Sequence, residues 1–352
     1  MKALWFIVAT VLVVCGASAA QAASPDPCAV TVFPRHGTYV PTKHLLGPGL
    51  ILNGGGAFEG PPSAWATVHD RIVGPHTVRA GNVVVLRASD ADLYDELFSK
   101  YGNFASNQTV LIPPCATRTA VDAVAPIVDK ADVVFFAGGD QSNYTIWKGS
   151  KLIDAVKRVY ARGGAVGGGS AGLAIQGAVI YDSASADRLG NDTHTADAVK
   201  YPLEPRISFT TGFFSWPSLV NTMTDTHFAK RDRFGRTVVF LARIFHDRVL
   251  PGVSPMYALG IDQASVVLVD RNGIGTVFNG APPGTNGAYL IRATATPHLK
   301  PGVPIRYAVD VSHVARSGES FDLLHKTTSD PWYRVVVDGS KTPPYSRDPY
   351  KP

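Results

Sequence analysis

The chain has 352 residues and a hydrophobic content of 45%, which is ample for a packed core of domain size. Lysine and arginine exceed aspartate and glutamate by 33 to 28, but no basic run has the length of a nucleic-acid-binding arm, so we expect no nucleic-acid partner. After residue 22 no stretch is long and apolar enough to span a bilayer, so we expect no membrane contact once the leader is removed.

The first 22 residues are typical of a secretory signal. One early lysine precedes an apolar run of about a dozen residues, and the small-residue pattern Ala20-Gln21-Ala22 follows, so we expect cleavage after Ala22. The apolar run is shorter than the ~20 residues of a membrane-spanning helix, which makes an uncleaved anchor the weaker alternative. A bulky residue before Cys15 argues against a lipoprotein site. We therefore expect a secreted or periplasmic protein.

Two cysteines remain in the mature chain. Cys28 and Cys115 can form one disulfide in an exported protein, although the sequence alone does not establish this pairing. The sequence also leaves the oligomeric state open, with a homodimer as one expectation. The sequence divides into a signal peptide (1–22), an arm rich in proline and glycine (23–47), an α/β domain (48–284) and a β-rich C-terminal extension (285–352).

Within the central region, apolar runs alternate with amphipathic segments. The apolar runs predict strands within 49–60, 82–88, 109–114, 132–143 and 165–169. The segments between them predict helices within 90–102, 149–164 and, despite Pro126, 118–131. Alternating apolar and polar residues predict further strands within 288–295, 305–312 and 332–339. The Pro-rich end, residues 341–352, fits either an ordered arm or a loose tail.

This order of elements favours an α/β fold with a doubly wound, mostly parallel sheet and helices on both faces. Three glycine-rich turns begin after Leu52, Phe136 and Val166, at the predicted carboxyl ends of strands. Open α/β sheets place their sites at these ends, so we expect the functional residues there.

The third turn has the sequence AVGGGSAGLA and carries Ser170. A sharp strand-to-helix turn projects such a serine, and neighbours without a Cβ give it room: Gly168, Gly169 and Gly172. We interpret Ser170 as a nucleophile, with the backbone N–H groups of Ala171 and Gly139 as oxyanion donors. The alternatives are a flexible-loop serine and a phosphate-binding loop, but the lysine spacing of the latter is absent.

The segment TDTHFAKRDRFGR supplies a candidate base, because it places a histidine between an acid and three arginines. Asp225 and His227 project to the same face of an extended segment, so both would enter one cleft. Arg231 can share a role with Arg233 and Arg236 only if it lies before the helix begins. Considered alone, His227 is most simply a packed or surface histidine, and the three arginines are most simply an ordinary solvated helix face.

Three segments together, VVFFAGGDQSN, AVGGGSAGLA and DTHFAKRDRFGR, resemble the cyanophycinases, serine hydrolases of peptidase family S51. The resemblance covers roughly residues 47 to 280. It implies a doubly wound fold of the flavodoxin-like or class I glutamine amidotransferase-like kind, with Ser170 as nucleophile and His227 as base. It implies cleavage of cyanophycin, a polyaspartate carrying arginine, into β-Asp-Arg dipeptides. The implied substrate-binding residues are Gln141, Asp225, Arg231, Arg233 and Arg236.

The chain departs from the family pattern beside the base and in the third catalytic residue. Thr226 stands where these enzymes usually have glutamine, and a Gly-Gly-Ser turn replaces Gly-Thr-Ser. The glutamate expected after the nucleophile helix is missing, so Asp187 is assigned the role of orienting His227, with Asp182 as the alternative. Asp225 is expected to pair with a substrate guanidinium, and the arginines with substrate carboxylates.

We expect no cofactor and no metal, since neither a complete nucleotide loop nor a His-Glu-x-x-His spacing occurs. A related isoaspartyl dipeptidase and a non-catalytic binding protein on the same fold remain alternatives. An α/β-hydrolase esterase is another, and it would take its base from the late histidines His298, His313 or His325.

Overall fold

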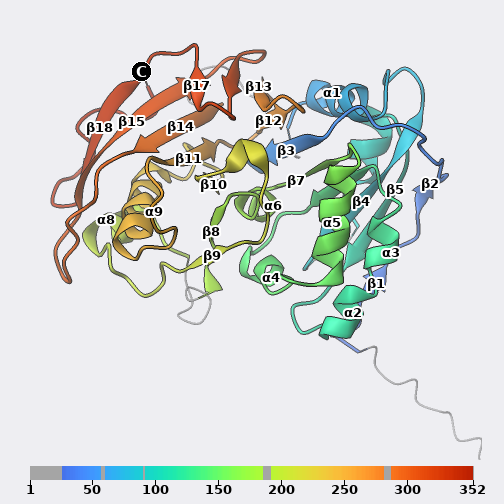
Figure 1. The fold of residues 1–352 in the computed structure, drawn as a ribbon, viewed down its shortest axis with the longest axis horizontal. Coiled ribbons are helices and arrows are strands. Elements are labelled where there is room, and N and C mark those ends of the chain that lie inside the picture. Colours follow the sequence, from blue (N-terminus) through green and yellow to red (C-terminus); the bar gives the residue numbers. More distant parts are fainter. Residues whose placement is uncertain (1–25, 57–59, 90–91, 185–191, 281–286, 352) are drawn as a thin grey trace, which may run out of the picture.

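The computed structural model describes residues 26–56, 60–89, 92–184, 192–280 and 287–351, and Figure 1 shows their arrangement in two β-sheets flanked by helices. The segment predicted to be a signal peptide, residues 1–22, lies outside the described residues. Among the helices that the structure describes, none has both the length and the apolar character needed to cross a membrane.

The first sheet has a parallel centre. Its central strands lie in the order β5, β4, β6, β7 and β3, with neighbours parallel throughout. If β4 is numbered as the first strand, then β5, β4, β6 and β7 follow the spatial order 2-1-3-4 of flavodoxin-like sheets. The fifth position, however, is taken by β3, which precedes these strands in the chain. The five strands are β3 (Gly49–Asn53), β4 (Ala80–Arg87), β5 (Phe104–Leu111), β6 (Val133–Phe136) and β7 (Ala165–Gly169).

Antiparallel strands extend this sheet at both edges. The arm supplies two short strands that pair with β5, and a disulfide between Cys28 and Cys115 fastens the arm to the domain. Beyond β3 the sheet continues through strands from the second half of the chain. In chain order the added strands are β1 (Thr31–Val32), β2 (His36–Gly37), β12 (Ser265–Val269), β13 (Ile274–Asn279), β16 (Ser320–Asp322) and β17 (Thr327–Thr328).

Helices cover both faces of the parallel strands, because alternate apolar residues of each strand point to opposite faces. On β4, Val83 and Val85 pack with α1 (Pro62–Ile72) and the π-helical turn η2 (Leu97–Tyr101). Val84 and Leu86 pack on the other face. That face is covered by α2 (Arg118–Asp122), α3 (Ala125–Val128) and α5 (Lys151–Ala161), with α4 (Ser142–Thr145) following β6.

The second sheet has seven strands, in the order β18, β15, β14, β11, β10, β8 and β9. Its parallel strands are β8, β10 and β11, and the others run antiparallel to their neighbours. The strands are β8 (Val179–Tyr181), β9 (Phe209–Thr211), β10 (Thr222–Asp225), β11 (Met256–Ile261), β14 (Ala288–Ala293), β15 (Arg306–Val314) and β18 (Tyr333–Asp338). Its associated helices are α6 (Ala171–Ala174), α8 (Thr195–Lys200), η3 (Pro217–Leu219) and α9 (Phe234–His246).

The two sheets meet at a junction that we call the seam. The chain leaves the first sheet at β7, passes through Ser170 and α6, and enters the second sheet at β8. Thr224 of β10 donates to the carbonyl oxygens of Leu173 and Ala174, at 2.8 and 3.2 Å. The N–H of His227 donates to the carbonyl of Gly54 at 2.9 Å, which links the end of β10 to the end of β3.

The predicted α/β class, the mostly parallel central strands and the β-rich C-terminal segment are confirmed. The strands of this C-terminal segment do not form a separate sheet, because β14, β15 and β18 belong to the second sheet and β16 and β17 to the first. The single helix predicted over 118–131 is wrong. Two short helices replace it, and Pro126 lies in the first turn of α3, where its missing N–H costs no intrahelical hydrogen bond.

Candidate active site

Ser170 occupies a strained turn between β7 and α6. Its φ of 51° and ψ of −115° are unusual for a residue with a side chain, and a sharp turn of this kind is how a nucleophile is held away from its own helix. The flanking glycines are required by close packing. A Cβ on Gly168 or Gly172 would lie 2.3 or 2.0 Å from the carbonyl oxygen of Phe136 on β6.

His227 lies within hydrogen-bonding distance of this serine. The Oγ atom of Ser170 and the Nε2 atom of His227 are 2.8 Å apart, although the two residues come from different sheets. His227 follows β10 with a φ of 46°, and the turn after it is held by the Asp262 carboxylate, which accepts the N–H of Lys230 at 2.9 Å. The local fold therefore presents the imidazole to the serine.

Burial lowers the pKa of His227 to about 3, and the positive charges of Arg231 and Arg233 act in the same direction. The imidazole is therefore neutral near pH 7, as a general base must be before it accepts a proton. Its other ring nitrogen, Nδ1, is buried and has no hydrogen-bond partner among the described residues.

No acid orients His227 within the described part of the chain. Asp182 is engaged elsewhere, because its carboxylate accepts the hydroxyls of Ser208 and Thr210 at 2.6 and 2.8 Å. Asp187, which the sequence favoured for this role, lies outside the described residues. The histidines of the esterase alternative are also placed elsewhere: His313 stacks on Tyr289, and the exposed His325 contacts Asp322.

A cavity of about 160 Å³ opens beside Ser170. It brings together every sequence-predicted oxyanion and substrate-binding residue: Gly139, Gln141, Ala171, Asp225, Arg231, Arg233 and Arg236. Ala171 is the first residue of α6, so its N–H has no acceptor within the helix. The side-chain amide of Gln141 donates to the carbonyl of Tyr181 at 3.1 Å and so fixes the end of β8.

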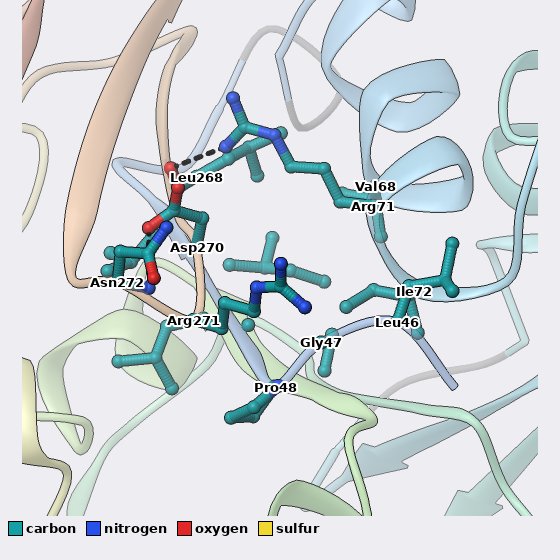
Figure 2. Close-up of a pocket in the computed structure, with 15 residues that line it drawn as sticks. Leu46, Gly47, Pro48, Val68, Arg71, Ile72, Leu268, Asp270, Arg271 and Asn272 are labelled. Atoms are coloured by element: carbon teal, nitrogen blue, oxygen red, sulfur yellow. Dashed lines mark hydrogen bonds between the residues drawn. The ribbon is translucent and has the colours of Figure 1, made fainter. Parts of the chain in front are cut away.

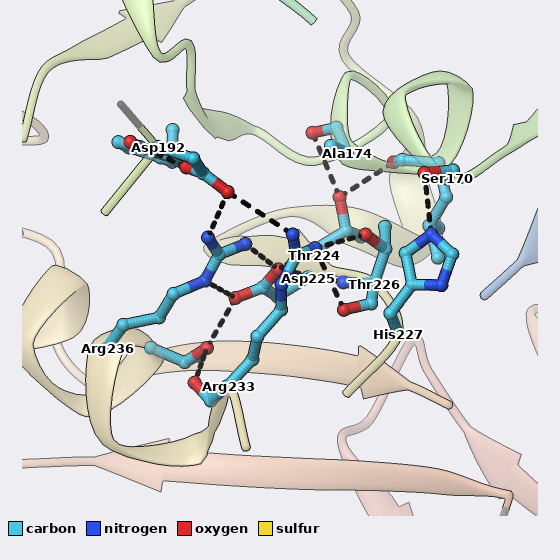
Figure 3. Close-up of polar contacts among 12 residues, drawn as sticks. Ser170, Ala174, Asp192, Thr224, Asp225, Thr226, His227, Arg233 and Arg236 are labelled. Atoms are coloured by element: carbon cyan, nitrogen blue, oxygen red, sulfur yellow. Dashed lines mark hydrogen bonds and ion pairs between the residues drawn. The ribbon is translucent and has the colours of Figure 1, made fainter. Parts of the chain in front are cut away.

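Behind the cavity, Asp225 and Arg236 form a buried bidentate pair (Figure 3). The Nη2 and Nε atoms of Arg236 lie 2.6 and 3.0 Å from the two carboxylate oxygens, and the hydroxyl of Thr237 adds a bond of 2.7 Å. Burial opposes the charge on Asp225, but the arginines outweigh it and lower its pKa. Both oxygens are occupied, so the expectation that Asp225 pairs with a substrate guanidinium does not fit this geometry.

Arg233 is also held by the protein. Its Nη1 atom donates to the backbone oxygen and the hydroxyl of Thr226 at 3.0 and 2.7 Å, and its Nη2 atom lies 3.3 Å from Asp192. Thr226, the residue that departs from the family pattern, therefore binds an arginine of the site. Burial, with Arg236 nearby, lowers the pKa of Arg233 to about 10, which leaves it charged near neutral pH.

Arg231 differs from Arg233 and Arg236, whose side chains are bound by other residues. It is exposed, it lines the cavity, and its side chain has no ion-pair partner in the part of the chain that the structure describes. It lies before α9, which begins at Phe234, as a shared role of the three arginines requires. Arg231 is therefore the guanidinium best placed to receive a carboxylate from solvent.

Sequence reasoning missed Asp192 and Tyr181. Asp192 accepts from Arg236 at 3.0 Å, and the Tyr181 hydroxyl donates to Asp192 at 3.0 Å. Burial opposes ionisation of Asp192, but Arg236 and Arg233 hold its pKa below the usual value. Asp192 stands in a polar stretch without periodicity, and only the fold brings it to the arginines.

A second cavity, of about 250 Å³, lies at the opposite end of β3 (Figure 2). Leu46, Ile72 and Leu268 line it together with Arg71, whose guanidinium donates to the Leu268 carbonyl at 3.0 Å. Neither Ser170 nor His227 lines this cavity, so it is separate from the candidate active site.

The sequence matches no family model and none of the curated proteins. Among solved structures, the chain is similar to a peptidase from an acI-B1 Actinobacterium, with 16% identity and a TM-score of 0.47 over 79% of this chain and 97% of the other. It is also similar to a protein named as a peptidase E from Listeria monocytogenes EGD-e, with 12% identity and a TM-score of 0.37 over 70% of this chain and 98% of the other. Neither likeness assigns a residue role to this chain.

Proposed function

We propose that this protein is a serine hydrolase that cleaves an amide bond next to an acidic group, through an acyl-enzyme on Ser170. The contact of 2.8 Å between the Ser170 hydroxyl and a neutral, buried His227 carries the proposal. A hydroxyl is a weak nucleophile until an adjacent base accepts its proton, and this pair supplies both groups.

The proposed reaction has two stages. His227 accepts the proton of Ser170 while Oγ attacks the amide carbon, and the N–H groups of Ala171 and Gly139 stabilise the oxyanion. The imidazolium then protonates the departing amine, and the C–N bond breaks. In the second stage His227 accepts a proton from water, the hydroxide attacks the ester, and the acid product leaves as Ser170 recovers its proton.

For the substrate we propose cyanophycin or a related β-aspartyl peptide, met outside the cell. The support is the resemblance to cyanophycinases together with Arg231, which is exposed at the cavity without a carboxylate partner among the described residues. Because arginine binds carboxylates in a bidentate manner, a free carboxylate of such a substrate suits this position, namely that of an arginine residue in cyanophycin or the aspartyl α-carboxylate in a β-aspartyl peptide. The secretory leader predicted from the sequence supports a substrate outside the cell.

The test compares Ser170→Ala with Ser183→Ala, since Ser183 lines the same cavity and its hydroxyl contacts Asp140, away from His227. Both proteins are incubated with insoluble cyanophycin, isoaspartyl dipeptides, p-nitrophenyl esters and a fluorophosphonate probe. We expect hydrolysis and labelling to disappear only in Ser170→Ala. Turnover by a folded Ser170→Ala protein would refute the mechanism. Dipeptide cleavage without release of β-Asp-Arg would replace cyanophycin by a smaller β-aspartyl substrate.

One observation favours a second candidate, a non-catalytic binding protein. The buried Nδ1 atom of His227 has no partner among the described residues, so no acid there stabilises the imidazolium that catalysis requires. Absence of both labelling and hydrolysis, with retained binding of a β-aspartyl peptide, would support this candidate.

A further inference from the structure

The C-terminal segment folds back onto the loop that carries the site arginines. We call residues 343–351 the tail and residues 228–233 the arginine loop. The tail runs beside β18, where Ser346 donates its N–H to the Val336 carbonyl at 2.9 Å and the Tyr333 hydroxyl donates to the Pro349 carbonyl at 2.8 Å. These bonds fix the tail to the second sheet independently of the arginine loop.

Two tyrosines of the tail converge on one carboxylate of that loop. The hydroxyls of Tyr345 and Tyr350 both donate to Oδ1 of Asp232, at 2.6 and 2.7 Å. Asp232 does not line the cavity, but it lies between Arg231 and Arg233, which do. Its φ of 46° is one that side-chain-bearing residues adopt rarely, so outside contacts must hold this conformation.

The same tyrosines contact both sides of the loop. The Tyr350 hydroxyl accepts the N–H of Phe234 at 3.1 Å, and this N–H belongs to the first turn of α9, where no intrahelical acceptor exists. The Tyr350 ring lies 6.2 Å from that of Phe228, at the start of the loop, and the Tyr345 ring lies 5.7 Å from that of Phe234. The tail therefore contacts the loop at its first residue, at Asp232 near its end, and at Phe234 directly after it.

We propose that Tyr345 and Tyr350 are positioning residues of the active site, which hold Asp232 and thereby direct the neighbouring Arg231 towards a substrate carboxylate. This inference deepens the proposed function and rests on it for the identity of the ligand. The tail supplies no group to the chemical step. Its loss would weaken recognition of an acidic substrate while the nucleophile remains reactive, because the Ser170–His227 contact involves neither tyrosine.

The test uses the full chain with both hydroxyls removed, Tyr345→Phe together with Tyr350→Phe, which keeps the ring contacts. Tyr307→Phe is the matched control, because this tyrosine also lies in the second sheet and its hydroxyl donates to the Ala295 carbonyl, away from the loop. In the double variant we expect KM for a β-aspartyl dipeptide to rise about 10-fold or more, since each lost hydroxyl removes a bond to a charged acceptor. The rate of Ser170 labelling by a neutral fluorophosphonate should stay within about 2-fold.

Hydrogen exchange gives a second measurement that needs no substrate. The amides of Arg231 and Arg233 donate to the carbonyls of His227 and Phe228 at 3.0 and 2.9 Å, and we expect them to exchange at least about 10-fold faster in the double variant. If the double variant shows unchanged exchange rates and an unchanged KM, the proposal is overturned. It is also overturned if Ser170 labelling falls by the same factor as recognition of the β-aspartyl dipeptide. Should the double variant fail to fold, Tyr350→Phe alone is measured in the same way. If the parent protein neither labels nor hydrolyses, the proposed function fails while the exchange result still decides the role of the tail.

Discussion

Gly55 lies where the side chains of Ser170 and His227, the proposed nucleophile and base, meet, and its replacement by alanine should separate them without removing either. A Cβ at this position would lie 2.8 Å from His227 Nε2, 2.8 Å from the Cβ of Ser170 and 2.9 Å from His227 Cε1. Ordinary contacts begin at 3.4 Å, so the groups must move by a few tenths of an ångström, and by about 0.6 Å to reach an unstrained contact. A displacement of this size along the Ser170–His227 direction extends their 2.8 Å contact to a length at which a hydrogen bond is largely lost.

The expected loss of activity follows from the separation of Ser170 from its proposed general base. Proton transfer by a positioned base contributes about 10²- to 10⁴-fold, so Gly55→Ala should lower both turnover and fluorophosphonate labelling by a factor in this range. The substitution also strains the backbone, because φ is 88° at Gly55. This strain amounts to about 1–2 kcal/mol and lowers the free energy of unfolding whether or not the site is disturbed.

Gly318→Ala separates the two effects. Its φ is 91°, close to that of Gly55, but a Cβ there has no atom within 4 Å. We expect both variants to lose similar stability in thermal melts, with labelling slowed only in Gly55→Ala. Equal labelling rates in the two variants would refute the reasoning, because the clash at Gly55 would then leave the catalytic pair intact.

Three further predictions follow. Arg231→Ala should raise KM for a β-aspartyl dipeptide about 10-fold or more and leave turnover of a neutral ester unchanged, and equal effects on both substrates would contradict carboxylate binding. Because the pKa of His227 falls from an ordinary 6.5 to about 3 in the folded protein, only the unfolded chain binds this proton between those values. The free energy of unfolding therefore decreases as the pH falls from about 6.5 towards 3, on the order of 1 kcal/mol per pH unit. In His227→Gln, denaturant melts should show a free energy of unfolding that depends less steeply on pH over this range. Replacing Cys28 and Cys115 by serine opens a loop with a sequence separation of 87 and should lower the free energy of unfolding by about 4 kcal/mol, and an unchanged denaturation midpoint would contradict this.

Local sequence patterns predicted the strand-to-helix turn at Ser170 because its geometry is local. Gly168 and Gly172 flank Ser170 within two residues on either side, and the strand-to-helix turn makes the close approach to Phe136 that excludes a side chain at both glycines. For Arg231 the sequence supplied a condition and no position: helical periodicity separates it from Arg233 and Arg236, so a shared role required it to lie before the helix.

The pairing of charges could not be predicted in the same way. The sequence places Asp225 and Arg236 11 residues apart, and their bidentate contact depends on where α9 begins and on how it packs against the second sheet. Asp192 contributes to the same cluster from a stretch without periodicity. Short-range patterns contain no information about such contacts, and for the same reason the tail appeared only as a Pro-rich end.

The placement of the proposed nucleophile and base on opposite sides of the seam makes the reactivity of Ser170 a measure of how the two sheets fit together. Proteins open locally at free energies well below that of global unfolding, and a junction between sheets is one place where such opening can occur. A shift of less than 1 Å here would disconnect Ser170 from His227 without unpacking the hydrophobic clusters, one of which joins residues of both sheets. Warming should therefore abolish the proposed hydrolase activity at a lower temperature than the one at which the circular dichroism signal is lost, and cooling should restore it.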